Sequence, residues 1–195
     1  MSIENQTIAI GESLRRLVKT LCARGYRFAH PARVLPGPQR DTSAAIARIE
    51  REIGTVPLAL KIFWQKVGSV DLCGSHPDWK GAFYPDPLVI FPPEIALGNL
   101  NDFLADREAN LEEGIPYLIP IAPDFYHKED VSGGMYYNVA FPADDDPLLN
   151  DEWHSTTLLG YLELALKSGG FPGVQRYPDH TWPIVDLVNE IYETS

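Results

Sequence analysis

The sequence predicts an α+β fold in which helices pack on a small, mostly antiparallel sheet. Apolar residues recur at helical spacing in several segments and alternate with a period of two in others. These helical and strand segments do not alternate strictly along the chain, which favours α+β over α/β. A chain of 195 residues is long enough for one well-packed domain and short for two.

The first predicted helix ends at Gly25 and carries an apolar stripe of Leu14, Leu17, Val18, Leu21 and Cys22. The Pro-rich stretch 29–40 follows, and neither the helical nor the strand period fits it. We therefore predict an N-terminal helical extension over residues 1–40, with its linker laid along the surface. The domain itself is predicted over residues 41–195.

Two helices joined by a tight turn are predicted to form the folding core. The first ends at Gly54, a residue that favours the C-terminal cap of a helix, and Pro57 begins the second. The second helix is apolar on two sides, which is typical of a buried helix. We expect its Phe63 and Trp64 to lie inside the protein.

The rest of the chain contains short strands between helices. Strands are predicted at 70–72, 88–91, 117–122 and 135–141, with a possible short one at 148–149; Pro120 indicates a sheet edge or a bulge. Helical segments are predicted as a turn at Pro93, a helix over 103–111, a helix capped by Ser155 or Thr156, and a last helix from Pro183.

Charge is spread unevenly over a net value of −11. Residues 1–40 hold seven Lys/Arg and two Asp/Glu, whereas the remainder is strongly acidic. An acidic body repels phosphates, so we expect no nucleic-acid partner and no binding to an anionic membrane surface. It suits a basic protein partner.

A cytoplasmic location is expected from three features. The two cysteines, Cys22 and Cys73, form no disulfide framework. The N-terminus lacks the pattern of a signal peptide, and no apolar run approaches the length of a membrane span.

No metal or cofactor is expected. Cys73 and His76 are three positions apart, but a zinc site needs a recognisable second pair of ligands. Three adjacent aspartates, residues 144–146, lack the spacing of a calcium-binding loop, which favours a solvated acidic loop instead.

An enzyme is not favoured by the motifs. His127 near Asp124 and His154 near Glu152 are the only local pairs suited to acid–base work. The sequence contains no nucleophile elbow, phosphate-binding glycine loop or dinucleotide fingerprint.

The segment from Asp124 to Glu152 is the candidate partner-binding region. It holds eight Asp/Glu and one lysine, interleaved with aromatic residues, and such charges and aromatics are typical of protein interfaces. The alternative is a strand with one buried aromatic face beside a solvated acidic loop. The candidate residues are Asp124, Tyr126, Glu129, Asp130, Tyr137, Asp144, Asp145, Asp146, Asp151, Glu152 and Trp153.

The paired helices, with their residues IEREIGTVPLALKIFWQKVG over 49–68, resemble the SUKH superfamily. Three further pieces are similar in order: DPLVIFP from Asp86, LIPIAPD from Leu118, and WHSTTLLGYLELAL from Trp153. The likeness covers about residues 41–173. The chain departs from the family at 67–69, where Val-Gly-Ser replaces the usual Asn-Gly-Gly, and over the first forty residues.

The superfamily groups a yeast cell-wall assembly regulator with many bacterial toxin-immunity proteins. The resemblance implies a non-enzymatic protein-binding domain, of the kind that sits on a toxin, for example a nuclease, and blocks it. No catalytic residues follow from it. Two alternatives stay open, namely a housekeeping regulatory or scaffold protein of the same fold, and a hydrolase using the His127 and His154 loops.

Overall fold

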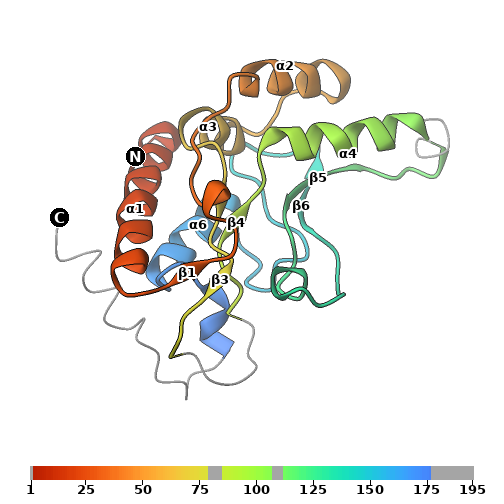
Figure 1. Cartoon of the computed structure of the whole chain (residues 1–195). Helices are drawn as coiled ribbons and strands as arrows, with labels where there is room; N and C mark the ends of the chain where they lie inside the picture. Colours follow the sequence, from red (N-terminus) through yellow and green to blue (C-terminus); the bar gives the residue numbers. More distant parts are fainter. Residues whose placement is uncertain (1, 79–84, 107–111, 177–195) are drawn as a thin grey trace.

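The computed structural model describes residues 2–78, 85–106 and 112–176 (Figure 1), and it confirms the α+β class. The α-helices of this part are α1 (Ile3–Ala23), α2 (Thr42–Ile53), α3 (Leu58–Lys66), α4 (Pro93–Ala105) and α6 (Leu158–Lys167). The strands are β1 (Arg27–Phe28), β2 (Val70–Asp71), β3 (Gly74–Ser75), β4 (Val89–Ile90), β5 (Tyr117–Ala122) and β6 (Tyr137–Phe141). Short 3-10 helices are η1 (Pro31–Arg33), η2 (His127–Glu129) and η3 (Pro172–Arg176).

The paired helices α2 and α3 form where the sequence predicts them. Gly54 ends α2 with a φ of 106°, a value that a residue with a Cβ rarely adopts. Pro57 immediately precedes α3. Phe63 and Trp64 are fully buried, which confirms their expected place in the core. Leu58 differs from the expectation of a helix apolar on two sides, because it is exposed at the helix start.

Helix α1 belongs to the main core and is not a separate extension. Its residues Ile10, Leu14, Leu17 and Leu21 are buried in the same cluster as the residues of α3 and α6. The physical reason is the apolar stripe itself, because it can be shielded from water only by packing against other helices. The stripe is also longer than predicted, and Cys22 at its end is exposed.

The Pro-rich stretch is a structural part of the domain as well. Figure 1 shows it crossing the front of the molecule from β1, through η1, to α2. The backbone amide of Ala29 donates to Cys73 and that of Asp71 donates to Val34, which holds the stretch against β2 and β3. The two backbones approach so closely that a Cβ on Gly68 would meet the carbonyl oxygen of Gly37 at 2.3 Å.

The strands form three two-stranded antiparallel sheets rather than one small sheet. The pairs are β1–β3, β2–β4 and β5–β6. The amide of Phe91 donates to the carbonyl of Ile121 and so connects the second and third pairs. The register of β5 on β6 shifts between Pro120 and Ala122, which confirms the predicted irregularity at this proline.

The helices of the second half differ in detail from the prediction. The turn at Pro93 and the start of the following helix are one continuous helix, α4. Thr157, rather than Ser155 or Thr156, caps α6, since its hydroxyl oxygen accepts from the amide of Gly160 at 3.2 Å. Instead of a strand at 148–149, Leu148 alone forms an isolated bridge to Thr157. The last predicted helix, from Pro183, and the end of the helix over 103–111 lie outside the described residues.

None of the described helices combines the length and the apolarity that crossing a bilayer requires.

Replacing Trp64 by alanine is expected to lower the free energy of unfolding by roughly 3–5 kcal/mol, because it leaves a large cavity in the core. The carbonyl of Phe91 would also lose the hydrogen bond that it accepts from the indole Nε1–H at 2.9 Å. Urea unfolding followed by circular dichroism measures the change. The matched control is Gln65→Ala on the exposed face of the same helix. Equal effects of the two substitutions would contradict the assigned core.

Candidate functional site

A buried ion pair holds the loops around the candidate site. Lys128 on η2 and Asp86 before β4 have side chains that are 0% and 1% exposed, and Lys128 Nζ lies 2.6 Å from Asp86 Oδ1. The Lys128 ammonium also donates to the hydroxyl of Tyr161 at 3.1 Å. The hydroxyl of Tyr137 donates to the second oxygen of Asp86 at 3.2 Å. Both charges are therefore compensated without water.

The two tyrosines of this cluster contribute through their rings as well. Lys128 Nζ lies 4.7 Å from the centre of the Tyr137 ring and 5.8 Å from that of Tyr161, distances typical of cation–π contacts. Burial raises the pKa of the Tyr161 hydroxyl, so the hydroxyl stays protonated. The cluster thereby ties η2, β6 and α6 together.

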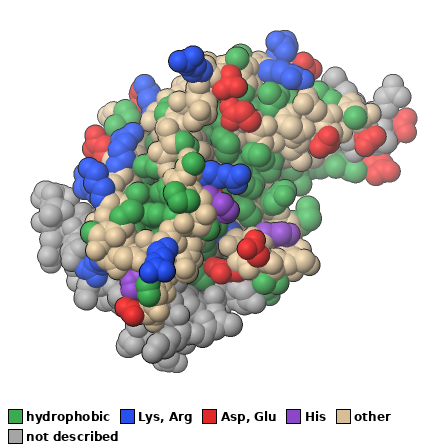
Figure 2. All heavy atoms as spheres, viewed as in Figure 1, with side chains coloured by type: hydrophobic (Ala, Val, Ile, Leu, Met, Phe, Trp, Pro, Cys, Tyr) green, Lys and Arg blue, Asp and Glu red, His purple; other side chains and the backbone are tan. Residues whose placement is uncertain are grey.

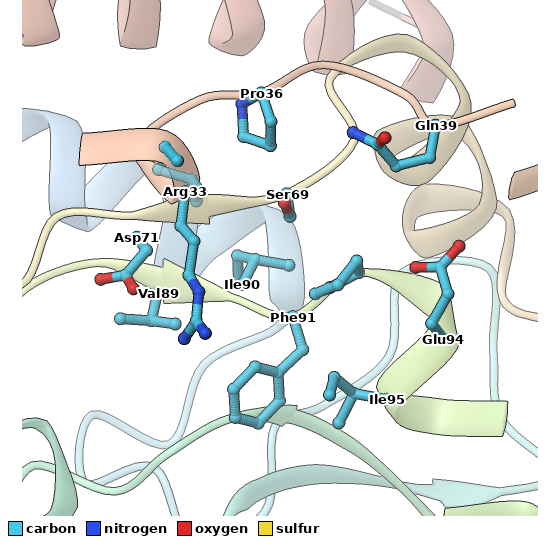
Figure 3. Close-up of a pocket in the computed structure, with 13 residues that line it drawn as sticks. Arg33, Pro36, Gln39, Ser69, Asp71, Val89, Ile90, Phe91, Glu94 and Ile95 are labelled. Carbon is cyan, nitrogen blue, oxygen red and sulfur yellow. The ribbon is translucent and has the colours of Figure 1, made fainter. Parts of the chain in front are cut away.

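A groove lies between the N-terminal segment and the body of the domain. One hollow of about 440 Å³ lies between η1 with its following prolines and the strand-to-helix junction of β4 and α4 (Figure 3). A second, of about 550 Å³, lies between β1, β3 and η2. Both hollows are lined by Arg33, Asp71, Val89 and Phe91. We therefore treat them as one continuous feature, the N-terminal groove.

Charged side chains of both signs line the N-terminal groove. His30 Nδ1 lies 3.0 Å from Asp71 Oδ2, and Arg33 reaches over the apolar floor. Figure 2 shows Lys/Arg and His side chains on one side of a hydrophobic area near the centre of this face, and His and Asp/Glu side chains on the other. The groove is thus apolar at its floor and charged at its borders.

Glu129 lines the second hollow and has an altered acidity. Burial, followed by the neighbouring charges of Asp130 and Asp86, raises the pKa of its carboxyl group to about 7. Its charge therefore changes near neutral pH.

His127 also lines the second hollow and is held by Asp124. Burial acts to raise the pKa of Asp124, but the hydrogen bonds from the His127 ring and from the amides of Tyr126 and His127 outweigh it, so the pKa is lowered. Asp124 thus stays ionised and fixes the start of η2.

The second histidine pair does not join the first in the groove. Glu152 is buried, accepts from the amide of His154 at 2.9 Å and contacts its ring, while Trp153 stacks on that ring with centroids 3.6 Å apart. His154 is not among the residues that line the groove. Within the described residues, no group of three His, Cys, Asp or Glu side chains is placed to hold a metal ion.

Cys73 and His76 have separate partners. Burial, with the nearby charge of Asp71, raises the pKa of the Cys73 thiol. His76 Nε2 lies 2.8 Å from the carbonyl oxygen of Arg24.

The predicted partner-binding residues divide by exposure. Asp124, Tyr137 and Glu152 are buried, so their side chains cannot contact a docked partner. Each of them pairs instead with a group inside the protein. Tyr137 donates a hydrogen bond to Asp86 of the ion pair, and the two acids contact the histidines and accept from backbone amides. Tyr126, Asp130, Asp144, Asp145, Asp151 and Trp153 are exposed, whereas Glu129 and Asp146 are half-buried.

Part of the acidic loop also serves the fold. Asp146 Oδ1 accepts from the amide of Leu159 at 3.0 Å, which adds a second cap at the start of α6. The carbonyl of Asp145 accepts from the amide of Ala59 in the first turn of α3 at 2.8 Å. Asp144 and Asp145 keep exposed side chains.

An exposed apolar surface borders the groove and was not singled out from the sequence. Met135 and Tyr136 are 63% and 48% exposed, and with Ile115 they line a third hollow of about 270 Å³ beside α4. The Tyr136 ring also packs edge-on against Phe91, with centroids 5.8 Å apart. We call the exposed apolar residues Ile95, Ile115, Met135 and Tyr136, which line the first and third hollows, the Tyr136 face.

Strand alternation could have indicated this surface, since Tyr136 and Tyr137 must point to opposite sides of β6. Which of the two points inwards depends on the buried ion pair, whose Asp86 is 51 positions away from Tyr137 in the sequence.

Comparisons with protein-family models, with curated proteins and with solved structures find no match for this chain.

Replacing Lys128 by methionine is expected to lower the free energy of unfolding by about 3–5 kcal/mol, because Asp86 would remain buried without a compensating charge. The double variant with Asp86→Asn should regain a large part of this loss. Asparagine tolerates the left-handed backbone of residue 86, whose φ is 51°. Urea unfolding measures both. A double variant no more stable than the single one would contradict the assigned role of the pair.

Replacing Glu129 by glutamine is expected to raise the free energy of unfolding above that of the wild type, and this gain should increase with pH. The folded-state pKa of about 7 exceeds the ordinary value of 4.5, so the wild type loses stability between these two pH values. The stability difference between variant and wild type should grow between pH 5 and 7 and level off above. Asp106→Asn, at an exposed acid after α4, is the control and should show no such growth. A constant difference for Glu129→Gln would contradict the raised pKa.

Proposed function

We propose that this chain is a non-enzymatic domain that binds a basic protein partner through the Tyr136 face. The observation that carries the proposal is the position of Tyr136, which lines the third hollow, packs its ring on Phe91 of the groove and stays half exposed. Aromatic residues and methionine are enriched at the centres of protein interfaces. Hollows beside an exposed aromatic residue provide places for the partner's side chains.

The charges around the face support a basic partner. Five acids line the three hollows, namely Asp71, Glu94, Asp102, Glu129 and Asp130, against the three basic residues Arg27, Arg33 and the buried Lys128. The chain as a whole has a net charge of −11. Such a surface attracts a positively charged protein over a distance and speeds its association.

The kind of partner follows from the resemblance to the SUKH superfamily. We propose that the chain is an immunity protein, and that it neutralises a toxin by covering the toxin's functional surface. Covering a toxin needs no catalytic step. The two histidines agree with this, because His127 and His154 contact Asp124 and Glu152, whose carboxylates hold the local backbone. We place this activity in the cytoplasm, since Cys22 and Cys73 are both free thiols.

The double variant Met135→Ala/Tyr136→Ala is expected to dissociate at least about tenfold faster from the partner, because truncating a central aromatic residue removes an anchor. The candidate partner is the product of the neighbouring gene, and surface-immobilised binding kinetics measure the rates. Asp102→Asn/Asp130→Asn should instead lower the association rate and flatten its dependence on salt. Co-expression should protect cells from the toxin less well with either variant.

Two controls separate this face from other surfaces. Leu148→Ala removes an equally exposed apolar residue outside the three hollows and should leave the dissociation rate unchanged. Asp144→Asn/Asp145→Asn tests the acidic loop beside α3. A loss of association only in this last variant would place the partner on the loop and overturn the assignment to the Tyr136 face.

A further inference from the structure

The first hollow of the N-terminal groove combines apolar walls with one carboxylate. Figure 3 shows Glu94 at the start of α4, across the opening from Gln39, with Ile90, Phe91 and Ile95 forming the adjacent wall. Pro36 lies on the opposite side, on the N-terminal segment. The hollow, about 440 Å³, has the size of a site that takes a ligand or a protruding side chain.

The Glu94 carboxylate lacks a partner within the described residues. Its Oε1 is shielded from solvent, and no described group donates a hydrogen bond to it. No described cation lies within 4.0 Å of the carboxylate. The first turn of α4 favours an acidic residue through the helix dipole but supplies no hydrogen-bond donor to its side chain.

A carboxylate that is partly removed from water and unpaired weakens the isolated protein. A bound cation would offset this loss, and the apolar wall beside the carboxylate would bind the hydrocarbon part of the same ligand. The hollow therefore suits a side chain with an apolar stem and a cationic end.

We propose that the hollow receives an arginine side chain of the basic partner, with its guanidinium group on Glu94 and its stem along Ile90, Phe91 and Ile95. The inference rests on the proposed function and names the residue type that this part of the surface recognises. Arginine fits better than lysine for two reasons. Its guanidinium group presents several N–H donors in one plane to the carboxylate, and it stacks on aromatic rings such as Phe91.

Arg33 limits the partner sequence that can enter. Its side chain reaches over Val89 towards Phe91 from the other border of the hollow, and within the described residues it forms no ion pair. A second cation next to the inserted arginine would be repelled there. We therefore expect the partner residue that occupies the second hollow, next to the inserted arginine, to be neutral or acidic.

The test uses N-acetyl-arginine amide as a probe, titrated into the full chain and followed by NMR chemical shifts. N-acetyl-citrulline amide has the same shape without the charge. The arginine probe is expected to bind saturably and to shift residues of the hollow, and the citrulline probe to bind at least about tenfold more weakly, as befits loss of a charge-assisted pair.

Substitutions test whether the arginine probe binds at the Glu94 carboxylate. Glu94→Gln should weaken the arginine probe at least about tenfold, which corresponds to the loss of one charge-assisted interaction. Asp106→Asn removes the same charge from the residue after α4, outside the three hollows, and should change the affinity less than about twofold. Arg33→Gln should leave the affinity equal or higher, because it removes a repelling charge. Melting temperatures check that each variant is folded.

The outcomes separate this inference from the proposed function. Equal binding of the two probes, or equal weakening by Glu94→Gln and Asp106→Asn, would overturn the arginine site. If the probe fails in this way while Met135→Ala/Tyr136→Ala still releases the partner faster, only the arginine site is refuted. If the probe behaves as expected but those substitutions leave partner binding unchanged, the Tyr136 face is refuted instead.

Discussion

The pairing of Lys128 with Asp86 is the interaction on which the surface of this domain depends. Helix η2 has only three residues, too few to be stable by itself. Its lysine is drawn into the core by the aspartate and by the tyrosines of β6 and α6, so the neighbouring residues of η2 are fixed at the surface. Glu129 next to it faces the groove for this reason, and so does His127.

The same cluster determines which side of β6 is exposed. Tyr137 is turned inwards because its hydroxyl compensates the second oxygen of Asp86. Alternation along the strand then turns Tyr136 outwards, where its ring lies against Phe91. A polar interaction in the interior thereby creates the apolar surface that we propose as the interface.

The N-terminal segment forms the other border of the groove. It is held by the packing of α1 in the core and by backbone hydrogen bonds to β2 and β3, so Arg33 and Pro36 stand opposite α4. A partner that inserts an arginine next to Glu94 would contact both parts of the chain. The proposed binding site thus depends on a stretch of sequence that resembles a linker.

The sequence by itself determined the local elements. The apolar stripes and the Gly54 and Pro57 signals lead to α2 and α3, because caps and helical periodicity depend on neighbours in the chain. Burial of Trp64 followed from the same periodicity, since Leu60, Phe63 and Trp64 lie on one apolar stripe of the helix. The α+β class followed from the order of these elements.

Only the tertiary structure decided how the elements share their surfaces. Whether α1 stands apart or completes the core depends on contacts with α3 and α6, which periodicity does not identify. Whether Tyr136 or Tyr137 faces outwards depends on an ion pair between residues 42 positions apart. Acidic residues look alike in the sequence, yet Asp124 and Glu152 are buried and contact histidine rings, while Glu94 stays unpaired beside a hollow. Burial and pairing are properties of the folded neighbourhood, and the sequence pattern carries no record of them.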